Sequence, residues 1–386
     1  MLMMAACLAK GAESMSPKRL CGHWFKGVSG GKRSMGSLTP TREKILAAAV
    51  AAPSADNSQP WQLRWRGGAL ELWIDEERSG HDSDSSYLLS DLALGACIEN
   101  ICIQASALGY VSHVALMPEL DHEPRKVAII TWSAAPKLDV DLAAVIPCRH
   151  TDRRFPWGPV AESSVVRLQS VGIDDGTARI QLIPAGEARA RASRILMRAE
   201  GLRFSSRTLH AELFRAIRFD VGWHQTCAEG LAPGTLFIER LLRLPFTALQ
   251  YWPIMRSLNV LGAASMLAWR GAYLPVSKSP LLFLLTAESL QRSHVLASGR
   301  LLERFWLRAT ALGLAVQPFA ALGAAAYGTV PIESRLERRR QSLKASVESI
   351  SKSGVGLVFL RVGQADASRP PMRNARREVV DLLMEA

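Results

Sequence analysis

The sequence predicts an α+β fold, because helix patterns and short apolar strand patterns follow one another along its 386 residues. Two long helix patterns, residues 93–109 and 297–313, align with each other without a gap, and each is followed by a strand pattern. We therefore expect two fused halves, with a mixed or antiparallel sheet flanked by helices.

The first half opens with a helix pattern over residues 41–52, which Pro53 ends. Residues 63–75 then alternate in polarity around two central glycines, and this predicts a β-hairpin with a two-residue turn. Ser90 or Asp91 is expected to cap the long helix that follows.

Four further segments have the composition and length of strands. Between the second and the third of them, residues 186–275 show helix patterns that have no counterpart in the first half, so this portion is interpreted as an insertion. The four expected strands are residues 126–133, 178–183, 279–286 and 355–363.

The alignment of the two long helices favours an internal duplication. Glycine and glutamate match at equal offsets near both helix starts, and the period is far too long for a solenoid. We expect a flexible N-terminal tail at residues 1–38, a first half at 39–145, and a second half at 146–386 that carries the insertion at about 186–275. The matched residues are Ala93, Gly95, Glu99, Ala105, Ala107, Leu108 and Gly109 with Ala297, Gly299, Glu303, Ala309, Ala311, Leu312 and Gly313.

The net charge of +12 comes without the patterns of a nucleic-acid-binding protein. One dense basic run, residues 333–350, has helical spacing, and we interpret its arginines as a solvated helix face, with an anionic ligand or partner as the alternative. No zinc-finger or RNP pattern is present. The apolar segment 258–269 is too short to cross a bilayer, so we expect no membrane span.

Cysteine usage and the N-terminus favour a cytoplasmic protein. The six cysteines form no CxxC pair, and we expect free thiols in a reducing compartment. Residues 1–38 contain no continuous apolar core, which argues against a signal peptide, and a true start at Met35 would explain this segment equally well. The eight histidines lack metal-ligand spacing, so no metal site is expected.

Two short motifs carry the candidate chemistry. APSADNSQPW, residues 52–61, predicts a rigid polar turn, and CRHTDRRF, residues 148–155, supplies the guanidinium and hydroxyl donors that hold a phosphate dianion. Taken alone, the first motif fits a helix stop with an Asx turn, and the second fits a capped surface loop. The expected anion cluster consists of Arg149, Arg153 and Arg154 around Thr151.

Together the two motifs resemble those of the FMN-dependent nitroreductase superfamily, which joins a helix to an APSxxNxQPW turn and holds the flavin phosphate with an Arg-x-Ser/Thr-x-Arg/Lys motif. In a family subunit the phosphate motif comes first, and each flavin lies between two subunits of a homodimer. The order is reversed here. The chain is therefore similar to duplicated, single-chain members, and the resemblance implies a monomer that acts as a pseudo-dimer with one intact flavin site.

The resemblance also implies which residues bind FMN. The arginine motif would hold the phosphate, the turn would contact the ring, and the basic C-terminal segment resembles the family's and would complete the phosphate site. No side chain is expected to be the catalyst, because the chemistry takes place at N5 of FMN. The implied cofactor-binding residues are Arg149, His150, Thr151, Arg153, Pro53, Ser54, Asn57, Arg373 and Arg376.

The implied activity is transfer of hydride from NADH or NADPH through FMN to a small-molecule acceptor such as a nitroaromatic compound or a quinone. His150 or an arginine of the cluster is expected to supply the positive charge that stabilises the anionic reduced flavin, and the insertion is expected to act as a lid. Two alternatives stay open. One is an FMN storage or sequestration protein whose lid prevents turnover, and the other is an oxidation partner that dehydrogenates thiazoline or oxazoline rings for a peptide-modifying enzyme.

Overall fold

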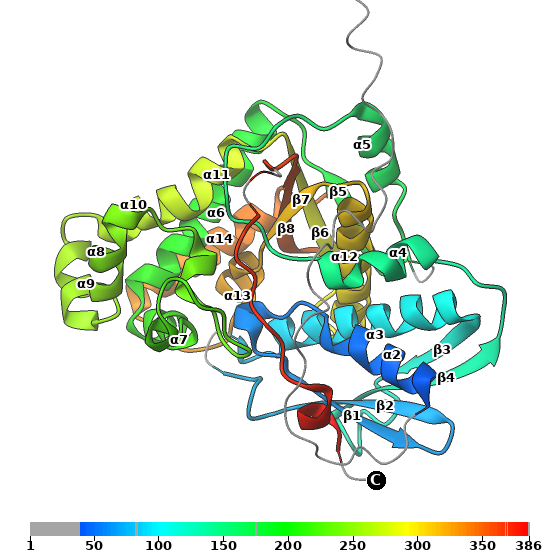
Figure 1. Cartoon of the computed structure of the whole chain (residues 1–386). Coiled ribbons are helices and arrows are strands. Elements are labelled where there is room, and N and C mark those ends of the chain that lie inside the picture. The colour runs from blue at the N-terminus through cyan, green and yellow to red at the C-terminus, as the bar shows by residue number, and fades with distance from the viewer. Residues whose placement is uncertain (1–38, 82–83, 174–175, 367, 369, 385–386) are drawn as a thin grey trace, which may run out of the picture.

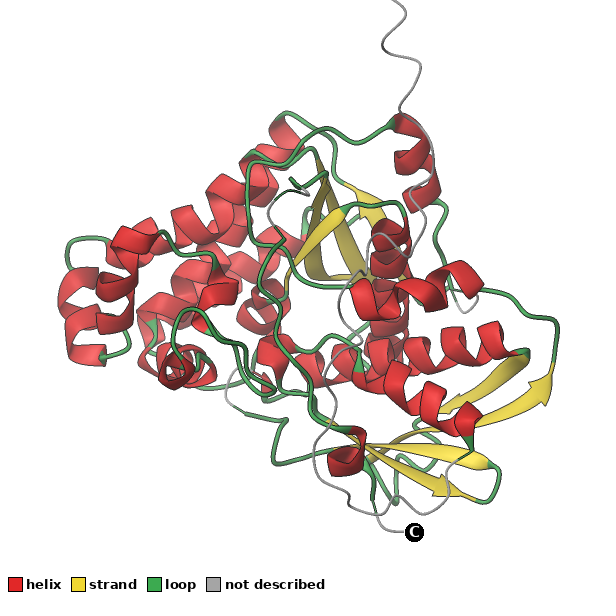
Figure 2. Cartoon of the chain, in the orientation of Figure 1, coloured by secondary structure: helices red, strands yellow, loops and turns green. Residues whose placement is uncertain are grey.

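Two four-stranded sheets, each packed against helices, form the body of the molecule, and further helices project to one side (Figure 1, Figure 2). The computed structural model describes residues 39–386 apart from 82–83, 174–175, 367, 369 and 385–386. The tail expected at residues 1–38 lies outside the described residues. The α+β prediction is confirmed, and all pairings within both sheets are antiparallel.

The two sheets repeat one strand order. The first runs β1-β2-β4-β3 and the second β5-β6-β8-β7, so equivalent strands occupy equivalent places. Both sheets also interrupt their register at the matching pair, between β2 and β4 and between β6 and β8. The strands are β1 (Trp61–Arg66), β2 (Ala69–Ile74), β3 (Tyr110–Leu116), β4 (Lys126–Ala134), β5 (Ala178–Leu182), β6 (Leu281–Ala287), β7 (Ala315–Phe319) and β8 (Val355–Gly363).

Most helices pack on the sheets or on one another around the two main clusters of buried apolar residues. The expected helix of residues 41–52 and the basic helix of residues 333–350 are present as α2 and α14. The helices of the body are α2 (Pro40–Val50), α3 (Leu88–Leu108), α4 (Val140–Val145), α5 (Glu162–Gln169), α12 (Arg292–Ala311), α13 (Ala321–Tyr327) and α14 (Ser334–Glu348).

The strands β3 and β7 were not predicted. β3 follows the helix-ending Gly109 at once and leaves most of its side chains exposed or half-buried, so it shows no apolar alternation. β7 contains Pro318, which breaks a strand pattern, but β7 is an edge strand and tolerates the missing backbone donor.

The predicted cap of α3 was wrong. Neither Ser90 nor Asp91 caps the helix, because both lie within its first turn. Instead, the carboxylate of Asp84 accepts hydrogen bonds from the backbone N–H groups of Leu89 (2.6 Å) and Ser90 (3.1 Å). The side chain of Asp91 is buried against α12, where it pairs with Arg292 at 2.8 Å. Asp91, which was expected to cap α3, therefore pairs with a residue of another helix instead.

Helices α3 and α12 cross at unusually close range. A Cβ atom built on Gly95 would lie 2.0 Å from the carbonyl oxygen of Leu296, and one built on Gly299 would lie 2.2 Å from that of Leu92. The contact is symmetric, since each glycine faces the residue three positions before the other. Matching glycines in the two aligned helices therefore let the two backbones touch.

Helix α3 is apolar enough and long enough to cross a membrane, but 83% of its most apolar window is buried inside the protein. It also carries the buried carboxylate of Glu99, which pairs with Arg300 at 3.0 Å and with Arg304 at 2.5 Å on α12. Burial and ion pairing on one helix are typical of a core element of a folded domain.

The helices that project to one side lie between β5 and β6 (left in Figure 1). In the first sheet, Gly67 and Gly68 alone connect the equivalent strands β1 and β2, as the predicted hairpin requires. The projecting helices have a small apolar core of their own. They are α6 (Glu187–Ser205), α7 (Arg207–Ala216), α8 (Arg243–Ala248), α9 (Trp252–Asn259), α10 (Ala263–Ala268) and α11 (Leu274–Ser277).

The C-terminal segment connects the two sheets. It leaves β8, descends between the projecting helices and the body, and ends beside β1 (red in Figure 1). There Leu383 forms a parallel bridge with Leu63, and the backbone N–H of Met384 donates to the carbonyl of Leu63 at 2.9 Å. The segment therefore passes over the region between the two halves.

We predict that Gly95→Ala and Gly299→Ala each lower the free energy of unfolding by about 3 kcal/mol, because the new methyl group forces the two backbones apart. Urea unfolding followed by circular dichroism measures this change. Gly201→Ala on α6 is the matched control, since its Cβ would meet Ala268 at an ordinary 4.0 Å. We expect this control to be neutral or stabilising by up to about 1 kcal/mol. Equal stability of all three variants would contradict the close crossing.

Candidate functional site

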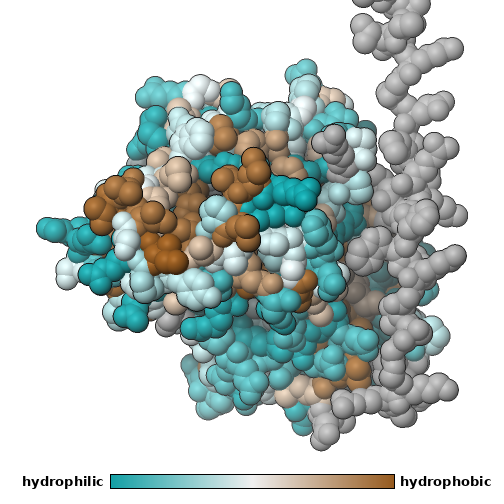
Figure 3. Space-filling model, turned by 60° about the vertical axis from the view of Figure 1, so that its left-hand side comes forward, coloured by the Kyte–Doolittle hydropathy of each residue, from teal (hydrophilic) through white to brown (hydrophobic). Residues whose placement is uncertain are grey.

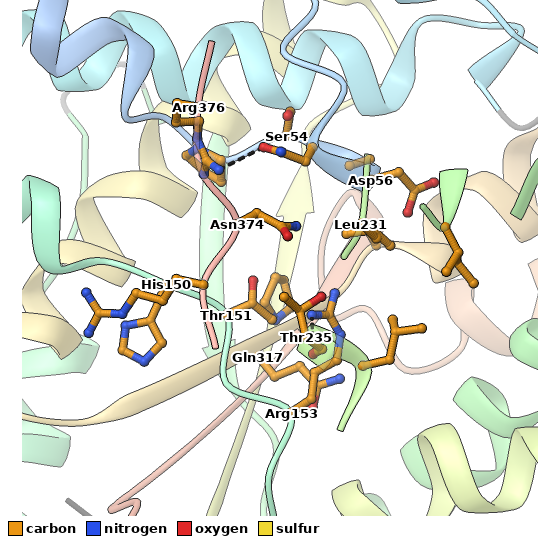
Figure 4. Close-up of a pocket in the computed structure, with 18 of the residues that line it drawn as sticks. Ser54, Asp56, His150, Thr151, Arg153, Leu231, Thr235, Gln317, Asn374 and Arg376 are labelled. Atoms are coloured by element: carbon orange, nitrogen blue, oxygen red, sulfur yellow. Dashed lines mark hydrogen bonds between the residues drawn. The ribbon is translucent and has the colours of Figure 1, made fainter. Parts of the chain in front are cut away.

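A cavity of about 1290 Å³ lies between the two halves, large enough for a nucleotide-sized ligand. Its walls come from the turn after α2, the segment before α5, the C-terminal segment and the projecting helices. The two predicted motifs, about a hundred residues apart in the chain, therefore share one cavity (Figure 4). All nine candidate residues line it: Pro53, Ser54, Asn57, Arg149, His150, Thr151, Arg153, Arg373 and Arg376.

Arg149 is anchored by protein groups. Its Nε lies 3.1 Å from Oε1 of the fully buried Glu303 on α12, and its Nη2 donates to the carbonyl of Ala51 at 2.8 Å. The guanidinium also stacks on the Trp306 ring, 4.6 Å from the centroid. Burial raises the pKa of Glu303 to about 7, although the charge of Arg149 acts in the opposite direction. Arg149 thus fastens the motif to α12 and brings its charge to the cavity wall.

His150 is neutral at physiological pH. Burial and the nearby charge of Arg373 lower its pKa to about 4. Its Nδ1 lies 2.8 Å from the carbonyl of Cys148, and a neutral ring must donate there, which leaves Nε2 as an acceptor. Of the two expected sources of positive charge, His150 or an arginine of the cluster, the neutral His150 does not serve, which leaves the arginines.

Thr151 and Arg153 present their side chains to the cavity (Figure 4). The backbone of Thr151 forms a parallel bridge with Val316 of β7, which fixes its position. The Thr151 hydroxyl makes no hydrogen bond with any described residue. Arg153 donates from Nη1 to the carbonyl of Thr235 at 3.2 Å, and burial lowers its pKa. The Thr151 hydroxyl, which lacks a hydrogen-bond partner among the described residues, and the desolvated guanidinium of Arg153 thus line the same cavity.

Arg154, which the sequence placed with the anion cluster, points away from the cavity. Its guanidinium pairs with the buried carboxylate of Asp152 at 2.6 Å. Behind them the fully buried Arg361 donates to the carbonyls of Asp152 (3.4 Å) and Arg154 (2.6 Å) and stacks on Trp157. These two arginines hold the backbone on either side of Arg153 instead of facing a ligand.

Asn57 is a structural cross-link. Its amide donates to the carbonyls of Ala228 (2.9 Å) and Ala375 (3.3 Å), and its oxygen accepts from Nη1 of Arg376 at 2.7 Å. Asn57 adopts a positive φ of 57°, a conformation that asparagine tolerates better than most residues. Its side chain is therefore used to tie the turn to the projecting part and to the C-terminal segment.

Gln59 has the same role, although it was not among the predicted cofactor-binding residues. Its amide donates to the carbonyl of Ala228 at 2.7 Å, and its oxygen accepts from the backbone N–H of Arg377 at 2.9 Å. The hydroxyl of Ser54 accepts from the backbone N–H of Gln59 at 2.9 Å, which closes the turn. Gln59 is fully buried. The fixed glutamine of the APSxxNxQPW motif is the signal in the sequence that could have found it.

Two arginines of the C-terminal segment reach the cavity. Arg376 is held by the carbonyl of Ala52 (3.2 Å) and by Asn57, and burial lowers its pKa to about 9, so it stays protonated at neutral pH. The backbone carbonyl of Arg373 accepts from the Thr226 hydroxyl at 2.8 Å, but its guanidinium makes no hydrogen bond or ion pair with any described residue. Burial and the charge of Arg149 lower its pKa. Arg373 is thus a partly desolvated cation that lacks a protein partner.

The cavity is lined by both charged and apolar side chains. Seven arginines and four carboxylates line it, so its charge is positive with His150 neutral. The projecting part contributes an apolar wall, made of Phe204, Leu213, Leu231, Leu236, Phe246 and Leu267. The arrangement suits a ligand that combines an anionic group with a flat apolar one.

One expectation about cysteines was also wrong. Cys97, Cys102 and Cys227 are free, but Cys148, directly before the arginine motif, is disulfide-bonded. Burial raises the pKa of the Cys102 thiol to about 11, and it raises that of Cys97 further, which makes both thiols unreactive. Among the described histidines, cysteines and carboxylates, no three lie together in a group that could hold a metal ion.

We predict that His150 titrates near pH 4 and stays neutral from pH 5.5 to 8. The pKa is depressed in the folded state, so the stability it contributes is present above the unfolded value of about 6.5 and is lost as the pH falls toward 4. NMR of protein labelled with ¹³C-histidine follows the ring, and His150→Asn identifies the signal. A midpoint near 6.5 would contradict the buried, neutral ring.

Comparison with known proteins gives distant matches. No protein-family model matches the chain. A Mycobacterium tuberculosis protein named "Putative NAD(P)H nitroreductase" is 24% identical over 349 residues, which cover 89% of this chain and 91% of the relative. A second protein of that name, from the same organism, is 28% identical over 180 residues, 46% of this chain and 54% of the relative.

An uncharacterized protein of Mycobacterium tuberculosis is 26% identical over 364 residues, and there the chain spans about half of the relative's length, 47%. Among solved structures, a "putative nitroreductase" from Anabaena variabilis matches over 86% of this chain and 90% of its own chain, with 12% identity and a TM-score of 0.36. The FMN-dependent nitroreductase NfnB from Mycobacterium smegmatis, solved with NADPH, matches 64% of this chain and 98% of its own, with 14% identity and a TM-score of 0.33. Along nearly its whole length, the chain is thus a distant homologue of a protein named putative NAD(P)H nitroreductase.

Proposed function

We propose that the protein is an FMN-dependent NAD(P)H oxidoreductase that reduces a small electron-poor acceptor. The observation that carries the proposal is the shared cavity, in which the turn motif and the arginine motif meet beside the unpaired Arg373. The names of the Mycobacterium tuberculosis relatives support NAD(P)H as the electron donor. The two halves would act as the two sides of one site within a single chain.

The cationic and hydroxyl groups of the cavity wall fit a phosphate group. The guanidinium of Arg373 and the hydroxyl of Thr151 have no partner among the described residues, and both line the cavity. A phosphate dianion gives such groups the charge-assisted hydrogen bonds that they lack. Arg149 and Arg153 add positive charge close by, although Arg149 keeps its bond to Glu303. We therefore assign Arg373 and Thr151 as the main phosphate ligands.

Other parts of the cavity wall fit the ring. The turn offers the backbone around Ser54 and Asp56, and the apolar wall offers side chains such as Leu231 (Figure 4). Asn57 is not assigned as a ring ligand, because its amide and its oxygen are already used in cross-links. Its role in the proposal is to hold the turn and Arg376 in place.

Bound FMN would supply the hydride transfer between NAD(P)H and an acceptor such as a quinone or a nitroaromatic compound. The protein would orient it, keep the surroundings positive and exclude water. Arg149 and Arg376 are the permanent cations for this purpose, since His150 is neutral. The projecting helices wall one side of the cavity and would shape the space left for the acceptor.

We predict that Arg373→Gln raises the Kd for FMN about tenfold to a hundredfold, because a charge-assisted hydrogen bond to phosphate is lost. Thr151→Val should raise it about fivefold. Titration of FMN into the apoprotein, followed by the change in flavin fluorescence, gives both values and a stoichiometry of one FMN per chain.

The control for these variants is Arg66→Gln. Arg66 is exposed on the β1–β2 hairpin and lies 3.9 Å from Glu71, away from the cavity. It should bind FMN like the unmodified protein. If Arg373→Gln and Thr151→Val bind FMN as tightly as this control, the assignment of the phosphate ligands is wrong.

We predict turnover, and this separates the enzyme from a protein that only stores FMN. The FMN-loaded protein should oxidise NADH or NADPH steadily when a quinone is present, because the cavity has room beyond a single flavin. Loss of NAD(P)H absorbance measures the rate. A flavin that binds but stays oxidised with both donors would overturn the oxidoreductase proposal in favour of storage.

A further inference from the structure

The tip of the projecting helices exposes an apolar surface of unusual extent. We define the tip as residues 237–270, which include α8, α9 and α10. Its four most exposed apolar residues are accessible to 91% (Leu241), 83% (Leu244), 86% (Val260) and 83% (Leu261). Soluble monomeric proteins seldom leave side chains of this kind together in water, unless the surface binds something.

Further apolar side chains extend this surface. Figure 3 brings the projecting part forward and shows apolar side chains gathered over it, with polar ones between them. The exposed apolar residues of the tip beyond the four above are Phe237, Leu242, Tyr251, Ile254, Leu258, Met266 and Trp269.

These exposed side chains are not part of the buried apolar cluster of the projecting helices. The tip packs inward through a small cluster around Phe214, Met255 and Ala264, and its other face has no packing partner among the described residues. Leu241 lies in the turn just before α8 and Leu244 in the first turn of α8, whereas Val260 and Leu261 form the turn between α9 and α10. Two separate turns thus expose apolar side chains to solvent. Such an arrangement suits a surface that inserts into an apolar environment at more than one point.

The charges of the tip are almost all positive. Arg240 and Arg256 are exposed and have no carboxylate partner among the described residues. Glu239 is the acidic residue of the tip, and it forms an ion pair with Arg270. Apolar projections surrounded by unpaired arginines match the interface of an anionic bilayer, in which acyl chains meet negatively charged headgroups.

We propose that this tip docks on the surface of membranes that contain anionic lipids, with Leu241, Leu244, Val260 and Leu261 entering the headgroup region. Charge complementarity favours this occupant over a second copy of the chain, because a symmetric contact between two tips would bring like charges together. The docking is peripheral. It requires neither FMN nor turnover.

The test is flotation of the full chain with vesicles of phosphatidylcholine, with or without a large share of phosphatidylglycerol. We expect binding to the anionic vesicles, and a variant with Leu241, Leu244, Val260 and Leu261 all changed to serine should bind at least about tenfold more weakly. Arg240→Gln combined with Arg256→Gln should reduce the preference for anionic over neutral vesicles, and so should added salt.

The matched control changes three exposed apolar residues of the body to serine: Leu138, Val140 and Val166, accessible to 64%, 57% and 60%. It should bind vesicles like the unmodified chain. Circular dichroism checks that every variant is folded. The proposal is overturned if the unmodified chain does not float with anionic vesicles, or if it floats equally well with the fourfold serine variant. It is also overturned if sedimentation shows a dimer that only this variant dissociates, since the tip would then be an interface between copies.

Discussion

The contact between α3 and α12 at Gly95 and Gly299 is the constraint on which the rest of the structure depends. With no side chain between them, the two helices bring their halves close enough for each to complete the other. Glu303 on α12 can then hold Arg149, and the carbonyl of Ala51 after α2 binds the same guanidinium. The cavity exists because this crossing places the arginine motif beside the turn of the first half.

The electrostatics of the cavity follow from burial. A buried ion pair such as Arg149–Glu303 contributes little net stability, because desolvation offsets the attraction, but it fixes geometry. For two other cations of the cavity, Arg373 and Arg376, less negative charge is close enough to offset the cost of desolvation. The guanidinium of Arg373 has no hydrogen-bond or ion-pair partner among the described residues, and burial lowers the pKa of both Arg373 and Arg376. Such groups gain most from an anionic ligand, since water no longer solvates them fully.

Sequence reasoning found the parts of the site that are local. The turn after α2 and the arginine motif are short, and their residue types suit one chemistry each, so their meeting in one cavity could be predicted from the resemblance. Side-chain contacts between residues far apart in the chain could not be predicted. Glu303 was visible only as a residue that matches Glu99, and nothing in the sequence indicated that it binds Arg149.

The sequence also does not show which side chains are buried. The neutral state of His150 and the turning of Arg154 toward Asp152 depend on which groups are shielded from water, and a single sequence does not show this. The same holds for β3 and β7, whose residues lack a strand pattern and are ordered by the neighbouring strands β4 and β8.

The most direct test of the central claim is a crystal structure of the protein grown with FMN. The account predicts one flavin per chain in the cavity between the halves, with its phosphate within hydrogen-bond distance of the Arg373 guanidinium and the Thr151 hydroxyl. A flavin bound elsewhere on the protein, or in this cavity with its phosphate turned away from both groups, would contradict it.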